Sequence, residues 1–142
     1  MVDISQKKLV PRRAVATGQI VLKKDTVAAI RGGTVKKGDV LTVAKVAALE
    51  GVKRTSSLIP LCHPIPITYA DIQFDVKEDR VGCRCEVRAD YKTGVEMEAL
   101  AGVSVALLTI WDMVKYLEKD ESGQYPYTRI TDLEVASKEK GE

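Results

Sequence analysis

The sequence contains few of the residues on which several common kinds of site depend. It has one histidine, one phenylalanine, one tryptophan and three cysteines in 142 residues. Cys62, Cys83 and Cys85 cannot all pair with one another, and their spacing is not that of a zinc site. We therefore expect reduced, packed thiols, no metal site and no disulfide framework.

Two further absences concern charge and long apolar runs. Lysine and arginine number 22 against 20 aspartates and glutamates, so the net charge of +2 creates no field that favours nucleic acid. An RNA-binding module would need exposed aromatic residues on a sheet, which this composition does not supply. No uncharged apolar run is long enough to cross a membrane, and the N-terminus lacks the apolar core of a signal peptide. We expect a cytoplasmic protein with no nucleic-acid partner and no membrane association.

The residues that are present have the proportions of an ordinary globular protein, with 45% hydrophobic and 30% charged residues. The length is sufficient for one domain with a real core, spanning residues 1–142. Residues 1–13 are basic with little apolar periodicity, which predicts an arm, and residues 137–142 predict a charged tail. The arm is either solvated or folds over a phosphorylated ligand.

Strand-like and helical patterns follow one another along the chain. Alternation predicts strands over residues 15–22, 67–77, 80–91 and 127–136, with a bulge near Asp71. Helical patterns cover a short segment that Asp25 caps and Gly32-Gly33 ends, residues 39–56, and the apolar part of 92–120. The order strand, helices, strand, strand, helix, strand predicts an α+β fold, a ferredoxin-like antiparallel sheet with helices packed on one face.

The stretch 92–120 is the longest apolar-periodic run, and its charges are the main candidates for chemistry. Residues 100–117 leave no wide polar face, which indicates a helix that is buried on most sides. Asp112 and Lys115 interrupt this run and share one helix face, because they are three residues apart. They are either an ordinary surface ion pair or an acid–base pair that faces a cleft or a partner subunit.

Glu96 and Glu98 precede this apolar helix. Residues two apart point the same way in an extended segment and opposite ways in a helix. If the helix begins only after Glu98, both carboxylates point into one space. The alternative is that they occupy the first helical turn, where acidic side chains favour the helix dipole.

Two other segments contain candidate residues. His63 lies in the loop 58–66, where three prolines exclude a regular helix and would hold the imidazole in one place for proton transfer. A structural role for this lone histidine is the alternative. Asp39 is expected to begin the helix 39–56, and Lys37 lies beside its free backbone N–H groups, an arrangement that suits a phosphate.

Four segments resemble one known family. They are KKGDV (36–40), KRTSSLIPLCHPIPIT (53–68), KTGVEMEALAGVSVALLTIWDMVK (92–115) and the opening MVDIS. These segments closely resemble the molybdenum cofactor biosynthesis protein C family, the cyclic pyranopterin monophosphate synthases. LIPLCHP, and TGVEMEAL with a downstream D-M-x-K, are highly specific motifs.

The resemblance implies an enzyme without a cofactor that acts on a small molecule, the cyclised GTP made by a radical-SAM enzyme. It would convert (8S)-3′,8-cyclo-7,8-dihydroguanosine 5′-triphosphate to cyclic pyranopterin monophosphate and pyrophosphate. It also implies a ferredoxin-like fold and a homo-hexamer, a trimer of dimers, with sites at subunit interfaces. Asp112 and Lys115 match the family's essential pair. The positions that match its substrate-binding residues are Arg12, Lys37, Lys53, Cys62, His63, Glu96, Met97, Glu98 and Lys138.

The inventory of residues fits this chemistry, because opening and reclosing rings needs proton transfers and loss of pyrophosphate needs cations. Two departures from the family pattern stand out. The segment 137–141 reads SKEKG where many relatives have Lys-Ser-Gly-Gly-Lys, so Lys138 lacks the flexible Gly-Gly after it. Trp111 and Val114 replace the usual tyrosine and cysteine beside the essential pair. The alternative from another class is a non-catalytic ligand-binding module on the same fold.

Overall fold

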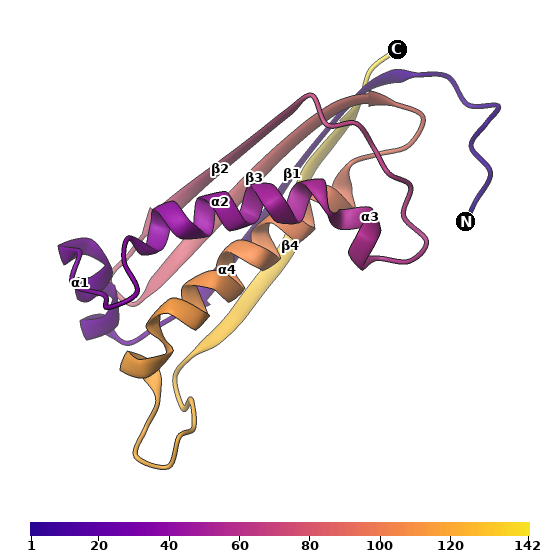
Figure 1. Cartoon of the computed structure of the whole chain (residues 1–142). Coiled ribbons are helices and arrows are strands. Elements are labelled where there is room, and N and C mark those ends of the chain that lie inside the picture. The colour runs from indigo at the N-terminus through magenta and orange to yellow at the C-terminus, as the bar shows by residue number, and fades with distance from the viewer.

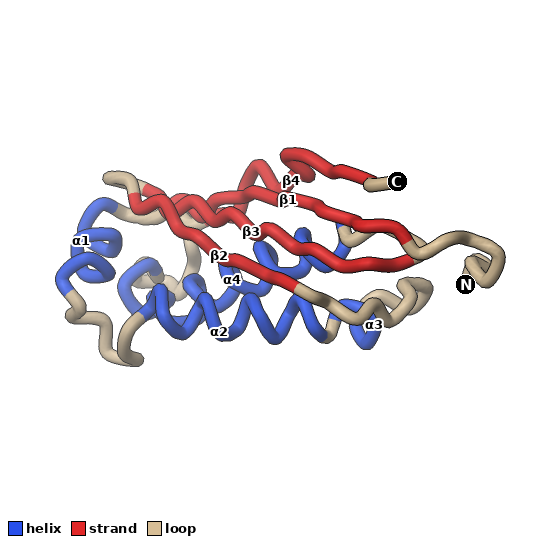
Figure 2. The backbone as a smooth tube through the Cα atoms, turned by 90° about the horizontal axis from the view of Figure 1, so that it is seen from above, coloured by secondary structure: helices blue, strands red, loops and turns tan.

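Four antiparallel strands form one sheet in the order β2-β3-β1-β4, and helices cover one of its faces (Figure 1). The computed structural model describes residues 1–142. The elements in chain order are β1 (Val10–Val21), α1 (Lys24–Gly32), α2 (Val40–Lys53), α3 (Thr55–Leu58), β2 (Tyr69–Val76), β3 (Arg80–Tyr91), α4 (Glu96–Glu118) and β4 (Arg129–Lys140). This order confirms the predicted ferredoxin-like α+β fold. Figure 2 shows the sheet and the helices as two layers, with both chain termini at the same end of the sheet.

The core lies between the sheet and the helices. β3 alternates as predicted, with Val81, Cys83, Cys85 and Val87 buried against the helices. All three cysteines are free. Burial raises the pKa of the Cys83 and Cys85 thiols to about 12, so both remain protonated at neutral pH. These two thiols are packed side chains, as predicted.

Helix α4 supplies the other side of the core. Its residues Val103, Leu107 and Ile110 are fully buried, because they form the stripe that faces the sheet. By length and composition alone α4 could cross a membrane, but 50% of its most apolar window is buried inside the molecule. This is the behaviour of a core helix.

Glycines allow α2 and α4 to approach each other closely. A Cβ atom on Gly51 would lie 2.8 Å from the Val105 side chain. On Gly102 it would lie 2.8 Å from both the Cys85 sulfur and the Val52 side chain. Such distances are shorter than van der Waals contact, so only glycine permits this packing.

The predicted start of the first strand and the predicted end of the last strand are wrong. Part of the arm pairs with part of the tail, so both strands are longer than predicted. β1 begins at Val10 and β4 continues to Lys140, so strand structure replaces part of the predicted arm and most of the predicted tail. Arg12 lies opposite Lys140, and Arg13 lies opposite Glu139. The Arg13 guanidinium also forms an ion pair with Glu139 at 3.2 Å. Backbone pairing between segments so far apart in sequence leaves no local pattern.

The predicted cap of α1 is also wrong, and the start of α4 decides between the two alternatives for Glu96 and Glu98. Lys23 occupies the N-cap of α1, while Asp25 lies in the first helical turn. α4 begins at Glu96 and not after Glu98. In both helices the acidic residues occupy the first turn, where they interact favourably with the positive end of the helix dipole.

The bulge predicted near Asp71 is absent, because β2 pairs with β3 without a register shift. Tyr69 faces the outer side of the sheet, where the Arg88 guanidinium lies 4.6 Å from the centre of its ring. Tyr69 and Ile72 are three residues apart in β2, so strand alternation points them to opposite faces of the sheet. The apparent change of register in the sequence is an ordinary change of face.

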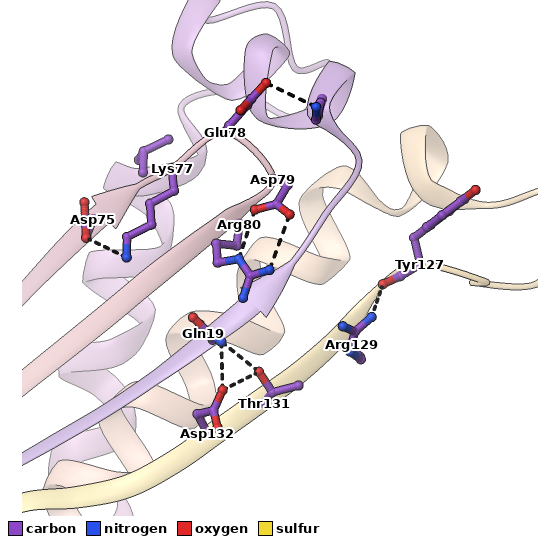
Figure 3. A network of polar contacts seen from close by, with 12 residues as sticks. Gln19, Asp75, Lys77, Glu78, Asp79, Arg80, Tyr127, Arg129, Thr131 and Asp132 are labelled. Atoms are coloured by element: carbon purple, nitrogen blue, oxygen red, sulfur yellow. Dashed lines mark hydrogen bonds and ion pairs between the residues drawn. The ribbon is translucent and has the colours of Figure 1, made fainter.

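Irregular pairing occurs instead between β1 and β4. Near the second register shift the Gln19 amide donates hydrogen bonds to the Asp132 carboxylate at 2.8 Å and to the Thr131 hydroxyl at 3.1 Å (Figure 3). Asp132 adopts a φ of 57°, a conformation that aspartate tolerates better than most residues. These bonds hold the bulge in place.

A buried carboxylate lies on the outer face of the sheet. Arg13 donates two hydrogen bonds to Glu86, at 3.0 and 2.9 Å, and Arg88 donates a third at 2.7 Å. The bidentate Arg13 contact, followed by that of Arg88, lowers the pKa of Glu86 to about 2. This network ties the middle of β3 to β1.

Gly102→Ala tests the close packing of the two long helices. We expect a loss of about 1–2 kcal/mol in the free energy of unfolding, because overpacking outweighs the ~1 kcal/mol that alanine adds to a helix. Urea unfolding measures the loss. Gly32→Ala is the matched control, since its added methyl group would lie 3.9 Å from the nearest atom and should be neutral or stabilising. A neutral Gly102→Ala variant would contradict the packing constraint.

Glu86→Gln tests the carboxylate network through its pH dependence. Because folding lowers the pKa from 4.5 to about 2, the stability from Glu86 is present above pH 4.5 and is lost as the pH falls toward 2. The free energy of unfolding of wild type should exceed that of Glu86→Gln by about 1–2 kcal/mol at pH 7, and this difference should vanish near pH 2. Urea unfolding at both pH values measures this difference.

The control for this experiment is Asp75→Asn, which removes an exposed ion pair between β2 and Lys77, the residue that follows this strand (Figure 3). That change should stay within about 0.5 kcal/mol at both pH values. A difference between wild type and Glu86→Gln that does not change with pH would contradict the assigned ion pairs.

Candidate active site

The predicted site residues form two groups at opposite ends of α4. Lys37, Asp112 and Lys115 lie near its C-terminal end, and we call them the lysine–aspartate cluster. Near its N-terminal end lie Cys62, His63, Glu96, Met97 and Glu98, which line one cavity that we call the histidine pocket. An α-helix rises ~1.5 Å per residue, so the groups stand about 20 Å apart.

In the lysine–aspartate cluster, one carboxylate lies between two ammonium groups. Lys37 Nζ lies 2.9 Å from one carboxylate oxygen of Asp112, and Lys115 Nζ lies 3.3 Å from the other. The hydrogen bond from Lys37, followed by that from Lys115, lowers the pKa of Asp112. Lys37 comes from the loop before α2, whose start is fixed by a hydrogen bond from the Thr42 N–H to the Asp39 carboxylate. The helix start predicted at Asp39 is therefore confirmed, with Asp39 as its N-cap.

The cluster is open to solvent in the single chain. The side chains of Lys37, Asp112 and Lys115 are 46%, 58% and 43% exposed. Exposed ion pairs add little to stability, so folding does not require this arrangement. Two lysines around one carboxylate also leave a net positive charge, which suits an anionic ligand. Both sequence interpretations of Asp112 and Lys115 therefore remain compatible with the geometry.

The histidine pocket is a cavity of about 340 Å³. Although α4 begins at Glu96, both glutamates line this pocket. Glu98 is buried, and burial followed by the charge of Glu96 raises its pKa. Burial followed by the charge of Glu98 likewise raises the pKa of the Cys62 thiol. The pocket thus contains a carboxyl group that keeps its proton to higher pH than usual, which suits an acid catalyst.

His63 lines the pocket, and Lys138 contacts one of its lining residues. The His63 Nε2 atom lies 2.8 Å from the carbonyl oxygen of Val2. Lys138 Nζ forms an ion pair with Glu96 at 3.2 Å, because β4 extends past its predicted end and passes the start of α4. The pairing of the tail as a strand therefore brings Lys138 to the pocket.

Arg12 and Lys53 line neighbouring cavities rather than the histidine pocket itself. Lys53 lines a cavity of about 460 Å³ that shares Ile65 with the histidine pocket. Arg12 lines a cavity of about 610 Å³ that shares Thr68 with the Lys53 cavity. The Arg12 guanidinium also donates to the Lys92 carbonyl oxygen at 3.2 Å. Shared lining residues thus link the three cavities, and the two beyond the histidine pocket each contain a candidate cation.

The structure contains no group of three or more His, Cys, Asp or Glu side chains that could hold a metal ion. It also shows lining residues that the sequence did not indicate. Val2, Ile4 and Lys7 form part of the wall of the histidine pocket. The sequence left open whether this arm is solvated or folds over a ligand, and the MVDIS motif does not decide between the two.

Comparisons with known proteins agree along the whole chain. The model of the MoaC family matches residues 1–141. A protein of Thermococcus kodakarensis named "Probable cyclic pyranopterin monophosphate synthase" is 59% identical over 142 residues, which cover 100% of this chain and 91% of that protein.

Two further relatives have the same name. The Pyrococcus horikoshii protein is 61% identical over 140 residues, which cover 99% of this chain and 88% of that protein. The Aeropyrum pernix protein is 59% identical over 141 residues, which cover 99% of this chain and 97% of that protein. The family match and these identities extend over both groups of candidate residues. The chain therefore belongs to the MoaC family.

Proposed function

We propose that this protein is a cyclic pyranopterin monophosphate synthase of molybdenum cofactor biosynthesis. It converts 3′,8-cyclo-7,8-dihydroguanosine 5′-triphosphate to cyclic pyranopterin monophosphate and pyrophosphate, and it acts in the cytoplasm. Its relatives carry the name of this enzyme. The structural observation that supports the proposal best is the pair of groups on α4, a carboxylate between two lysines at one end and a buried carboxyl beside an imidazole at the other.

These groups can perform the steps that the reaction needs. Rearrangement of the ring system requires proton donors and acceptors, which Asp112, Lys115 and the histidine pocket provide. Departure of pyrophosphate requires positive charge, for which we propose Lys37, Lys53 and Arg12. The remaining pocket residues would hold the ring system, and Lys138 would neutralise a carboxylate or contact a phosphate.

We further propose that the active site forms between subunits. About 20 Å along α4 is more than the reacting ring system can span, so the two groups of one chain cannot act on it together. In an assembly with two-fold symmetry, the lysine–aspartate cluster of one subunit would face the histidine pocket of its partner. A homo-hexamer built as a trimer of dimers would contain such pairs.

Exposed apolar side chains beside the lysine–aspartate cluster support this assembly. Leu108 lies one turn before Asp112 and is 58% exposed. Across the helix pair, Val43 and Val46 of α2 are 42% and 58% exposed. α2 and α4 run antiparallel, with Lys37 before α2 lying against Asp112, so these residues are near the same end of the helix pair as Leu108. Exposed apolar side chains gathered at one end of the molecule are typical of a surface that a partner covers.

Replacing Asp112 with Asn or Lys115 with Ala should each lower turnover of the cyclised nucleotide by roughly 10²- to 10⁴-fold, the usual effect of losing a positioned proton-transfer group. The double variant should be hardly worse than either single variant, because groups that act as a unit are not additive. Single-turnover assays measure these rates. Lys24→Ala, which removes an exposed ion pair with Glu78, is the control and should leave turnover unchanged. Near wild-type product formation by either variant would favour a non-catalytic role.

Mixing inactive variants tests whether the site spans two subunits. Lys115→Ala and Glu98→Gln, produced together in one cell, should regain about a quarter of wild-type activity, because a mixed two-fold pair contains one intact site. Lys115→Ala combined with Asp112→Asn should regain none, since both changes affect the same group. Light scattering and native mass spectrometry confirm that mixed oligomers are present. No recovery by the first pair in confirmed mixed oligomers would place the site within one chain.

A further inference from the structure

The N-terminal segment of the chain folds back over the histidine pocket. From the N-terminal end of β1 it runs toward the loop that contains His63, beside α3 (Figures 1 and 2). We call residues 2–7 the N-terminal strap. Val2, Ile4 and Lys7 of the strap line the pocket, so the strap forms one of its walls.

Two hydrogen bonds hold the strap to the rest of the molecule. The His63 Nε2 atom lies 2.8 Å from the Val2 carbonyl oxygen. Lys92 Nζ donates to the Ser5 carbonyl oxygen at 3.1 Å. Within the strap, the Ser5 N–H donates to the Asp3 carboxylate at 2.9 Å. The strap therefore has a local turn of its own and two points of attachment.

The bond to Val2 fixes the state of the imidazole. A carbonyl oxygen only accepts hydrogen bonds, so the proton of the neutral ring must sit on His63 Nε2. The Nδ1 atom then carries a lone pair and can act as a base. The closed strap thus selects one tautomer and one ring orientation, and both would change if it opened.

The attachments of the strap are few and exposed. Val2 is 76% exposed, and among the strap residues only Ile4 is half-buried. Little apolar area therefore holds the strap closed. Segments with exposed hydrogen bonds and little burial open at low cost in free energy. The strap can consequently open while the two-layer core remains folded.

We propose that the N-terminal strap is a movable wall of the histidine pocket, that Lys92 holds it closed through Ser5, and that closure orients His63 with Nδ1 unprotonated. Lys92 is then a positioning residue, because it acts through the strap and not on the substrate. The meaning of this arrangement for catalysis rests on the proposed function. The motion and its effect on His63 do not, so both can be tested without substrate.

Cys62 reports on the opening of the strap. It lines the pocket and is half-exposed, while Cys83 and Cys85 are buried, so N-ethylmaleimide should modify one thiol per folded chain. Lys92→Met should raise the modification rate about fivefold, as loss of one exposed charge-assisted hydrogen bond would. Loss of a positive charge alone would not raise the rate of Cys62 modification, since it does not make a thiol more reactive. Lys45→Met, on the exposed surface of α2, is the control and should react like wild type.

The single histidine allows a second measurement. Its ring gives the only imidazole nitrogen signals in a ¹⁵N NMR spectrum, and in wild type they should be those of a fixed Nε2–H tautomer. In Lys92→Met the Nδ1 and Nε2 signals should move toward each other as the tautomers exchange. Lys92→Arg, which keeps a donor, should restore both the signals and the modification rate.

Asp3→Ala provides an independent variant, because it removes the turn inside the strap and leaves the core intact. Like Lys92→Met, it should raise the rate of Cys62 modification and move the two imidazole nitrogen signals toward each other. Unchanged Cys62 modification and unchanged imidazole signals in both variants would overturn the proposal, as would equal effects in Lys45→Met. Inactivity toward the cyclised nucleotide would count against the proposed function alone, since neither measurement uses that substrate.

Discussion

The close antiparallel packing of α2 on α4 determines where every candidate group lies. Gly51 and Gly102 remove the side chains that would keep these helices apart. The N-terminal end of α2 then places Lys37 against Asp112. Its other end leads into the proline-rich loop that carries His63 beside the start of α4. The helix pair therefore acts as a rigid spacer with one polar group at each end, and a local change in helix distance would displace both.

The sheet contributes to only one of these groups. β1 and β4 pair along almost their whole length, as far as Arg12 and Lys140. This pairing carries Lys138 to Glu96 and directs the N-terminal strap toward the pocket. The histidine pocket is therefore built from three chain segments that are far apart in sequence. The lysine–aspartate cluster needs only the two helices, and it is correspondingly open.

The features that could be predicted are those that leave a local pattern. Alternation along β3 and the missing polar face of α4 indicated both the core and the fold class, because burial repeats with the period of each element. The paired arm and tail could not be predicted, since the ion pair between Arg13 and Glu139 joins residues at opposite ends of the chain. The same applies to the division of the site. The motifs identified the candidate residues, and the structure shows which of them come together at each end of α4.

Charge gives a physical reason why the two groups would meet between subunits. The lysine–aspartate cluster has one more positive charge than negative, and the histidine pocket contains Glu98, a carboxyl group whose pKa is raised by burial. Lysines of a partner subunit placed near Glu98 would oppose the effect of burial and lower that pKa again. A site formed in this way would adjust its acid only when both halves are present. The single chain would hold Glu98 without Lys37 and Lys115 beside it, so assembly would bring these cations to the pocket and adjust the pKa of its carboxyl group through the same electrostatic contact.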